Sequence, residues 1–132
     1  MNAIQKIQLD RVRAASFNNL DGELVANDLE ASQELWKGFV FGRFKYYELI
    51  ELRDISEAIL NADTLMILTT IEKWPELQKL INSWNADEVG WIGMVDREIC
   101  YLHTYPCTKE ELFQNYGGGL EEGEIIVRVW WD

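Results

Sequence analysis

A run of consecutive apolar residues constrains the fold of this chain more than any other feature. Four of them, from Leu65 to Leu68, follow one another within residues 64–70. Successive side chains of a strand point to opposite faces, so such a run buries both faces and predicts an interior strand of a sheet. Residues 89–95 are also apolar or small at every position and predict a second interior strand.

The residues between these two runs predict a helix. The apolar residues at helical spacing are Leu77, Leu80, Ile81 and Trp84. Pro75 has no amide hydrogen to donate and suits the first helical turn, so we expect a helix over residues 75–84. Strand, helix and strand together predict a βαβ unit over residues 64–95, in which two parallel strands pair through a right-handed crossover.

The remaining segments supply further elements on both sides of this unit. Apolar spacing and capping signals predict helices over residues 3–16, 23–37, 54–62 and 109–115. Alternating patterns predict strands over residues 39–41, 44–52, 98–105 and 124–132. A helix stays open as the alternative for 44–52. We therefore expect one α+β domain over residues 1–132, with a mixed sheet of about four to six strands and helices packed mainly on one face.

The charge of the chain narrows the classes of partner. Its 12 basic and 23 acidic residues give a net charge of −11. Phosphate groups repel such a chain, so we expect no direct binding to nucleic acid and none to anionic membrane surfaces. Membrane-span and signal-peptide patterns are both missing, which predicts a cytoplasmic protein.

The negative charge concentrates in the last third of the chain, where residues 87–132 hold ten acidic and three basic residues. Such a segment attracts a basic protein surface. We therefore expect a basic protein partner, and homo-oligomerisation stays open. The candidate binding residues are Trp130, Glu121, Glu122, Glu124, Asp132, Asp87 and Glu88.

Strand alternation assigns the two C-terminal tryptophans to different environments. One face of the predicted strand is wholly apolar and consists of Ile125, Val127, Val129 and Trp131. The other face carries Arg128, Trp130 and Asp132. We expect Trp131 to be buried in the core, and Trp130 to be partly exposed and to anchor an interface.

Residues 100–107 contain the only cluster with soft metal ligands: Cys100, His103 and Cys107. On a strand, Cys100 and His103 point to opposite faces, so we expect no metal site there. With a single His and no nucleophile motif, the sequence predicts no catalytic triad and no cofactor.

These observations favour a non-enzymatic acidic binding protein. Its concrete form is an inhibitor, of the immunity or anti-defence type, that engages a basic surface on a nuclease or another nucleic-acid-binding protein. This functional class is chosen by analogy with small acidic inhibitors. Two alternatives remain: a small, metal-dependent enzyme that uses His103, and a structural subunit of an obligate complex.

Overall fold

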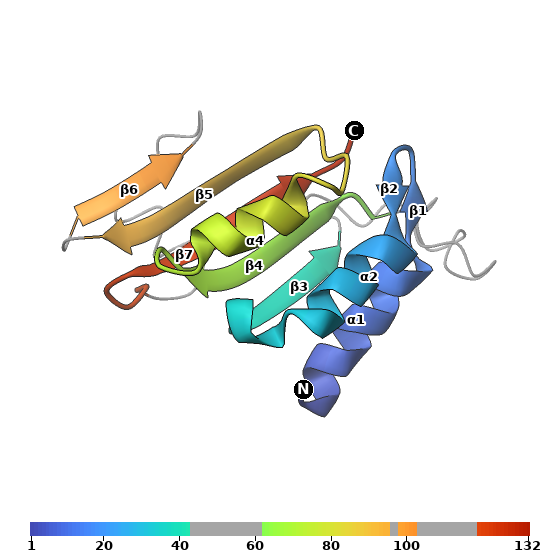
Figure 1. Cartoon of the computed structure of the whole chain (residues 1–132), viewed down its shortest axis with the longest axis horizontal. Coiled ribbons are helices and arrows are strands. Elements are labelled where there is room, and N and C mark those ends of the chain that lie inside the picture. The colour runs from blue at the N-terminus through green and yellow to red at the C-terminus, as the bar shows by residue number, and fades with distance from the viewer. Residues whose placement is uncertain (43–61, 96–97, 103–118) are drawn as a thin grey trace.

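A computed structural model of the chain describes residues 1–42, 62–95, 98–102 and 119–132 (Figure 1). The α-helices are α1 (Ala3–Ala14), α2 (Gly22–Ala31) and α4 (Trp74–Ile81), and the 3-10 helix is η1 (Gln33–Leu35). The strands are β1 (Ser16–Phe17), β2 (Leu20–Asp21), β3 (Gly38–Gly42), β4 (Thr64–Thr70), β5 (Glu88–Val95), β6 (Glu98–Leu102) and β7 (Glu124–Trp130). The predictions for 44–52, 54–61, 103–105 and 109–115 lie outside the described residues.

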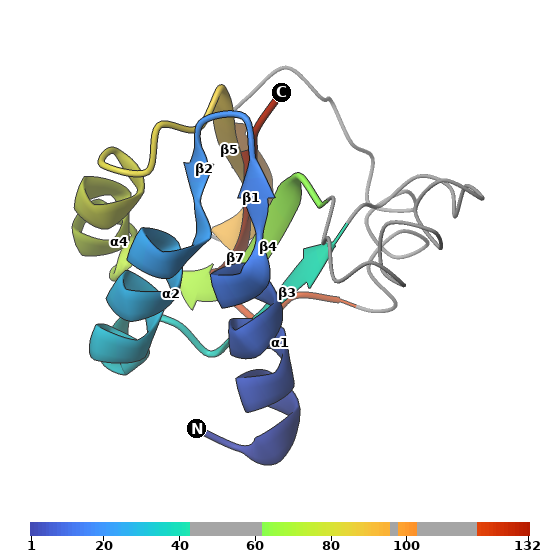
Figure 2. The ribbon, with the colours of Figure 1, turned by 90° about the vertical axis from the view of Figure 1, so that its right-hand side faces the viewer.

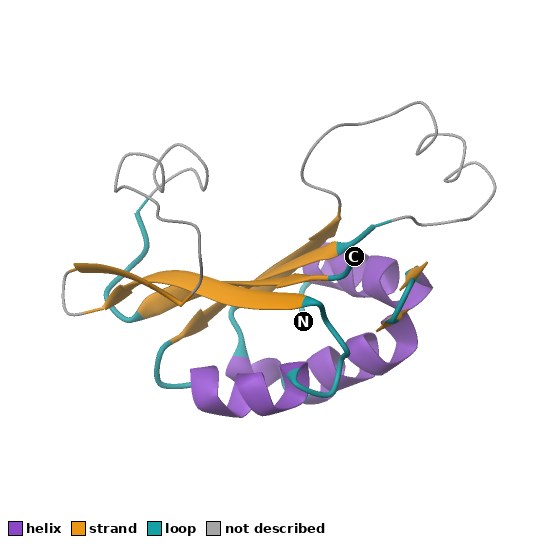
Figure 3. Cartoon of the chain, turned by 90° about the horizontal axis from the view of Figure 1, so that it is seen from above, coloured by secondary structure: helices purple, strands orange, loops and turns teal. Residues whose placement is uncertain are grey.

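The main sheet has five strands in the order β3-β4-β7-β5-β6, and β1 and β2 form a separate two-stranded hairpin. Figure 3 shows the three α-helices on the same side of the main sheet. The predicted α+β architecture, a sheet of four to six strands and helices mainly on one face are therefore confirmed.

The predicted parallel pairing of the first two interior strands is wrong, although the strand–helix–strand unit itself is present. β4 and β5 run in the same direction because each pairs antiparallel with β7, which lies between them. Every described strand pair is antiparallel. A helical crossover sets the direction of the two strands but leaves room for a third strand between them. β7 fits that space because Ile125, Val127 and Val129 continue the buried apolar face of the sheet between β4 and β5.

The core lies between the main sheet and the helices. The strand residues on this face are fully buried, among them Leu65, Ile67, Val127 and Val129. Helices α1, α2 and α4 cover them with Val12, Leu29 and Leu77, each at 0% exposure. The apolar alternation of β7 therefore predicted its buried face correctly.

Three predicted helices are shorter than expected. The helix predicted over 3–16 ends at Ala14, and Ser16 begins β1. The helix predicted over 23–37 ends at Ala31 and continues as η1, after which the indole N–H of Trp36 donates to the carbonyl of Leu29 at 3.0 Å. The helix predicted over 75–84 ends at Ile81. Trp84 follows in a turn and is still buried, at 1% exposure. Helical spacing thus identified the core residues Leu77, Ile81 and Trp84 but not the residue at which the helix ends. In the first two helices it also marked Ile4, Ile7 and Leu24 as apolar-face residues, and these are exposed.

Among the described strands, β3 is the outermost at one side of the main sheet, and α1 lies beside it (Figure 2). The side chain of Gln5 accepts from the amide of Phe39 at 2.9 Å and donates to the carbonyl of the same residue at 2.8 Å. Gln8 accepts from the amide of Phe41, also at 2.9 Å. Two glutamine side chains therefore bind the backbone groups that β3 directs away from the sheet.

Candidate functional site

The candidate residues nearest the C-terminus gather at one end of the main sheet. Here β4 and β5 begin and β7 ends, since both Thr64 and Glu88 pair with Trp130. Four carboxylate residues lie at this end, and we call them the acidic edge: Asp63, Asp87, Glu88 and Asp132. The topology of the sheet thus brings together Asp87, Glu88 and Asp132, which the sequence analysis named as candidates, and Asp63, which it did not name.

Hydrogen bonds to neighbouring strands fix the backbone of the acidic edge. The amide of Asp87 donates to the carbonyl of Trp130 at 3.0 Å, and the amide of Asp132 donates to a carboxylate oxygen of Asp87 at 2.8 Å. On the other side, the amide of Trp131 donates to the carbonyl of Asp63 at 3.0 Å. The side-chain amide of Asn18 donates to the carbonyl of Asp132. The carboxylates are therefore carried by ordered backbone.

Trp130 lies on the face of β7 opposite the buried Val129 and Trp131, and its side chain is partly exposed. The guanidinium carbon of Arg128 lies 5.8 Å from the centroid of the Trp130 ring, which is within cation–π range. Arg128 also lies 3.9 Å from a carboxylate oxygen of Glu88, at the long limit of an ion pair. The indole is thus an apolar surface beside the cation Arg128, and Glu88 is its partner on the neighbouring strand.

Trp131 has the opposite environment and is 0% exposed. Its indole N–H donates to the carbonyl of Trp84 at 3.0 Å, and the indole N–H of Trp84 in turn donates to Asp28 at 2.7 Å. The predicted division is confirmed for burial: Trp131 belongs to the core and Trp130 is partly exposed. The interface role of Trp130 stays a prediction.

The other three candidates lie at the opposite end of β7. Glu124 is buried, and its carboxylate accepts from the ammonium group of Lys37 at 2.7 Å and from the amide of Glu121 at 2.7 Å. The side chain of Glu121 is 82% exposed and lies 4.0 Å from the same ammonium group. Glu122 is exposed as well. Glu124 therefore stabilises the start of β7, whereas Glu121 and Glu122 face solvent.

The ion pair with Lys37 shifts the titration of both partners. The hydrogen bond from Lys37 lowers the pKa of Glu124, with a smaller contribution from the amide of Glu121 that opposes the cost of burial. The same hydrogen bond raises the pKa of Lys37. These shifts belong to a structural contact and do not indicate catalysis.

The seven candidate residues do not form one patch. Glu124 and Trp130 are the two ends of β7, and a strand rises about 3.3 Å per residue, which places them roughly 20 Å apart. Trp130, Asp132, Asp87 and Glu88 remain together at the acidic edge. Their proximity depends on β7 lying between β4 and β5, which is the feature the sequence analysis did not predict.

Sequence reasoning missed Asp63 and Lys37, and it placed Arg128 on the face of Trp130 without naming it as a candidate binding residue. Asp63 directly precedes the strand that begins at Thr64, so its place at a strand end was a usable signal. Lys37 pairs with a residue 87 positions away, and no local pattern reveals such a contact. For Arg128 the signal was strand alternation, which places it on the same face as Trp130, two residues away.

The residues considered for metal binding are only partly described. Cys100 lies in β6, and His103 and Cys107 lie outside the described residues. Within the described ranges, no group of three or more His, Cys, Asp or Glu residues is placed to hold a metal ion. None of the helices in these ranges is long and apolar enough to cross a membrane.

Comparison of the chain with protein-family models, with curated proteins and with solved structures found no match.

Proposed function

We propose that this chain is a non-enzymatic binding protein that engages a basic protein surface through its acidic edge. The observation that carries the proposal is the position of Trp130, which is partly exposed and lies at the end of the sheet where the four residues of the acidic edge gather. Aromatic anchors are enriched at the centres of interfaces, and surrounding charges steer the encounter. Trp130 supplies the aromatic anchor, and the acidic edge supplies the surrounding charge.

Charge also supports the type of partner. The net charge of −11 adds long-range attraction to any basic surface. Proteins that bind nucleic acid carry such surfaces, because most of their affinity comes from contacts with phosphate. The concrete form we propose is inhibition of a nuclease or another nucleic-acid-binding protein in the cytoplasm, by occupation of its basic cleft.

Two other functions remain as alternatives. A structural subunit of an obligate complex would also present Trp130 at an interface, but it would bind through a mainly apolar surface. A metal-dependent enzyme would use His103, which lies outside the described residues.

The proposal is tested by affinity capture at low salt from the cells that make the protein. The bait is compared with a triple variant of the acidic edge, Asp87→Asn, Glu88→Gln and Asp132→Asn. Each change removes charge and keeps the shape of the side chain, and the carboxamide introduced at position 87 retains an oxygen to accept from the backbone amide of residue 132. The matched control removes three carboxylates elsewhere: Asp10→Asn, Glu30→Gln and Glu72→Gln, all of which are exposed.

We expect the wild type and the control to retain the same basic protein, and the triple variant to lose it. The association rate of the purified pair should fall steeply with added salt, because the Debye length is about 10 Å at 0.1 M. Equal retention by all three baits, or a salt-independent association rate, would refute an electrostatic interface at the acidic edge.

A further inference from the structure

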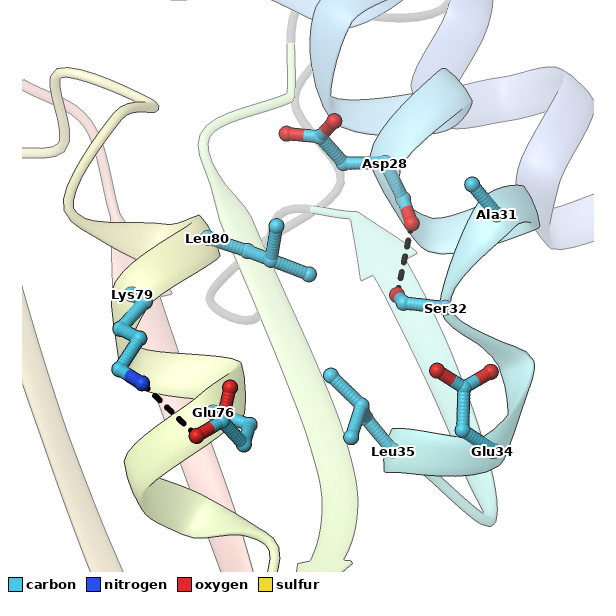
Figure 4. A pocket seen from close by; sticks show the side chains of 8 residues that line it. All are labelled: Asp28, Ala31, Ser32, Glu34, Leu35, Glu76, Lys79 and Leu80. Atoms are coloured by element: carbon cyan, nitrogen blue, oxygen red, sulfur yellow. Dashed lines mark hydrogen bonds and ion pairs between the residues drawn. The ribbon is translucent and has the colours of Figure 1, made fainter.

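A cleft of about 350 Å³ lies on the helical side of the molecule, between α4 and the segment formed by α2 and η1 (Figure 4). Leu80 from α4 and Leu35 from η1 extend into the space between these elements and form its apolar floor. Both leucines are partly exposed. The size of the cleft is at the lower end of the range for ligand pockets, about 300–1,000 Å³. It therefore suits one side chain rather than a large cofactor.

The rim of the cleft is acidic. Asp28 and Glu34 lie on one side, and Glu76 lies on the other. The carboxylate of Asp28 accepts from the indole N–H of Trp84 at 2.7 Å, and this neutral donor leaves its negative charge in place. Glu76 pairs with Lys79 of its own helix at 2.8 Å. In the described part of the chain Glu34 makes no ion pair, so three carboxylates face a single cation.

An apolar floor beneath an acidic rim selects a particular kind of group. An arginine side chain has an apolar stem that can lie on the two leucines and a planar guanidinium that can reach carboxylates on both sides. Guanidinium is also less strongly hydrated than the ammonium group of lysine, so it tolerates contact with Leu35 and Leu80 better. Anionic ligands are excluded by the same carboxylates.

We propose that this cleft receives an arginine side chain displayed by a partner protein. The cleft is open, and its rim residues Glu34, Glu76 and Lys79 are exposed. A free small molecule bound there would stay largely exposed to solvent, whereas a side chain carried by a protein gains further contacts between that protein and the rim. The cleft lies on the helical face and shares no residue with the acidic edge, so the two proposals fail independently.

The test is an NMR titration of the full chain with the capped dipeptide acetyl-Leu-Arg-amide. The reference ligand is the same dipeptide with citrulline in place of arginine, which keeps the shape and removes the charge. Titration to about 10 mM reaches tenfold above a Kd of about 1 mM. We expect saturable shifts in the amide signals of η1 and α4 with arginine, and at least fivefold weaker binding of the citrulline peptide.

The variant Glu34→Gln with Glu76→Gln should weaken arginine binding about fivefold, since an exposed ion pair changes affinity roughly two- to fivefold. The control, Asp10→Asn with Glu72→Gln, makes the same change in net charge away from the cleft and should bind like the wild type. A second variant, Ala31→Arg, places a guanidinium on the lining itself and should also block the peptide. A dispersed amide spectrum for each variant confirms that it is folded.

Four results would overturn the proposal. Three of them are the absence of saturable shifts at the cleft, equal binding of the citrulline peptide, and an equal loss of binding in the control. Tighter binding of free L-arginine than of the capped peptide would also overturn it, because the cleft would then be a small-molecule site.

Discussion

Replacement of Trp131 by Ala is the sharpest test of the packing described here. Trp131 is 0% exposed and lies among the core residues between the main sheet and the helices. A buried aromatic removes about 150–250 Å² from water, which at about 25 cal/mol per Å² corresponds to roughly 4–6 kcal/mol. Compact unfolded chains lower such values by about 10–40%. We therefore expect Trp131→Ala to reduce the free energy of unfolding by about 4 kcal/mol, within the usual range for deleting a core aromatic.

The hydrogen bond of Trp131 is separated from its packing by a second variant. Trp131→Phe keeps an aromatic ring but leaves the carbonyl of Trp84 without its donor, and it should cost about 1–3 kcal/mol. Trp130→Ala serves as the matched control, because Trp130 is partly exposed and precedes Trp131 on the opposite face of the sheet. It should cost about 1 kcal/mol, the size of a cation–π contact.

The assay is urea unfolding followed by far-ultraviolet circular dichroism, which does not depend on the tryptophans being changed. With a slope of about 2 kcal/mol per molar, a loss of 4 kcal/mol moves the midpoint by about 2 M. Equal losses for Trp130→Ala and Trp131→Ala would show that both faces of β7 are core. That result would also remove Trp130 as an interface anchor.

Two further predictions concern single contacts. Glu124→Gln should cost about 1 kcal/mol at neutral pH, a modest value because the Lys37 side chain is 43% exposed to solvent screening. Because the folded-state pKa of Glu124 lies below 4.5, its contribution is present above that pH and is lost as the pH falls through the folded-state pKa. Because the pKa of Lys37 lies above 10.5, the contribution of Lys37 is lost only at higher pH. Urea titrations across pH should show the difference between wild type and variant shrink as the pH falls from the ordinary pKa of a glutamate through the lowered folded-state pKa of Glu124, and a difference that does not change with pH would contradict the assignment. Gly22→Ala should cost about 1–3 kcal/mol in the same assay, because a β-carbon there would overlap the backbone carbonyl of Val12, and an unchanged midpoint would show that α1 and α2 can separate freely.

Local patterns predicted the elements of this fold better than their arrangement. The alternation from Ile125 to Trp131 placed the correct side chains in the core, because successive side chains of a strand point to opposite faces and the apolar set identifies the buried one. The position of β7 between β4 and β5 was not predicted, because strand order depends on pairings between distant segments. The candidate site divided for the same reason. Residues close in sequence, such as Glu124 and Trp130, lie at opposite ends of one strand, whereas Asp87 and Asp132, 45 positions apart, are joined by a hydrogen bond.

The contacts of Gln5 and Gln8 with β3 bear on how this molecule avoids assembling with itself. An edge strand with free backbone groups is a template on which another chain can add a strand. Apolar burial does little to hold the first turns of α1, since Ile4 is 71% exposed and Ile7 is 56% exposed. Two amide side chains therefore shield this edge, and they do so by imitating the hydrogen bonds of a missing strand. A chain that loses both glutamines would keep its core and expose a ready site for polymerisation.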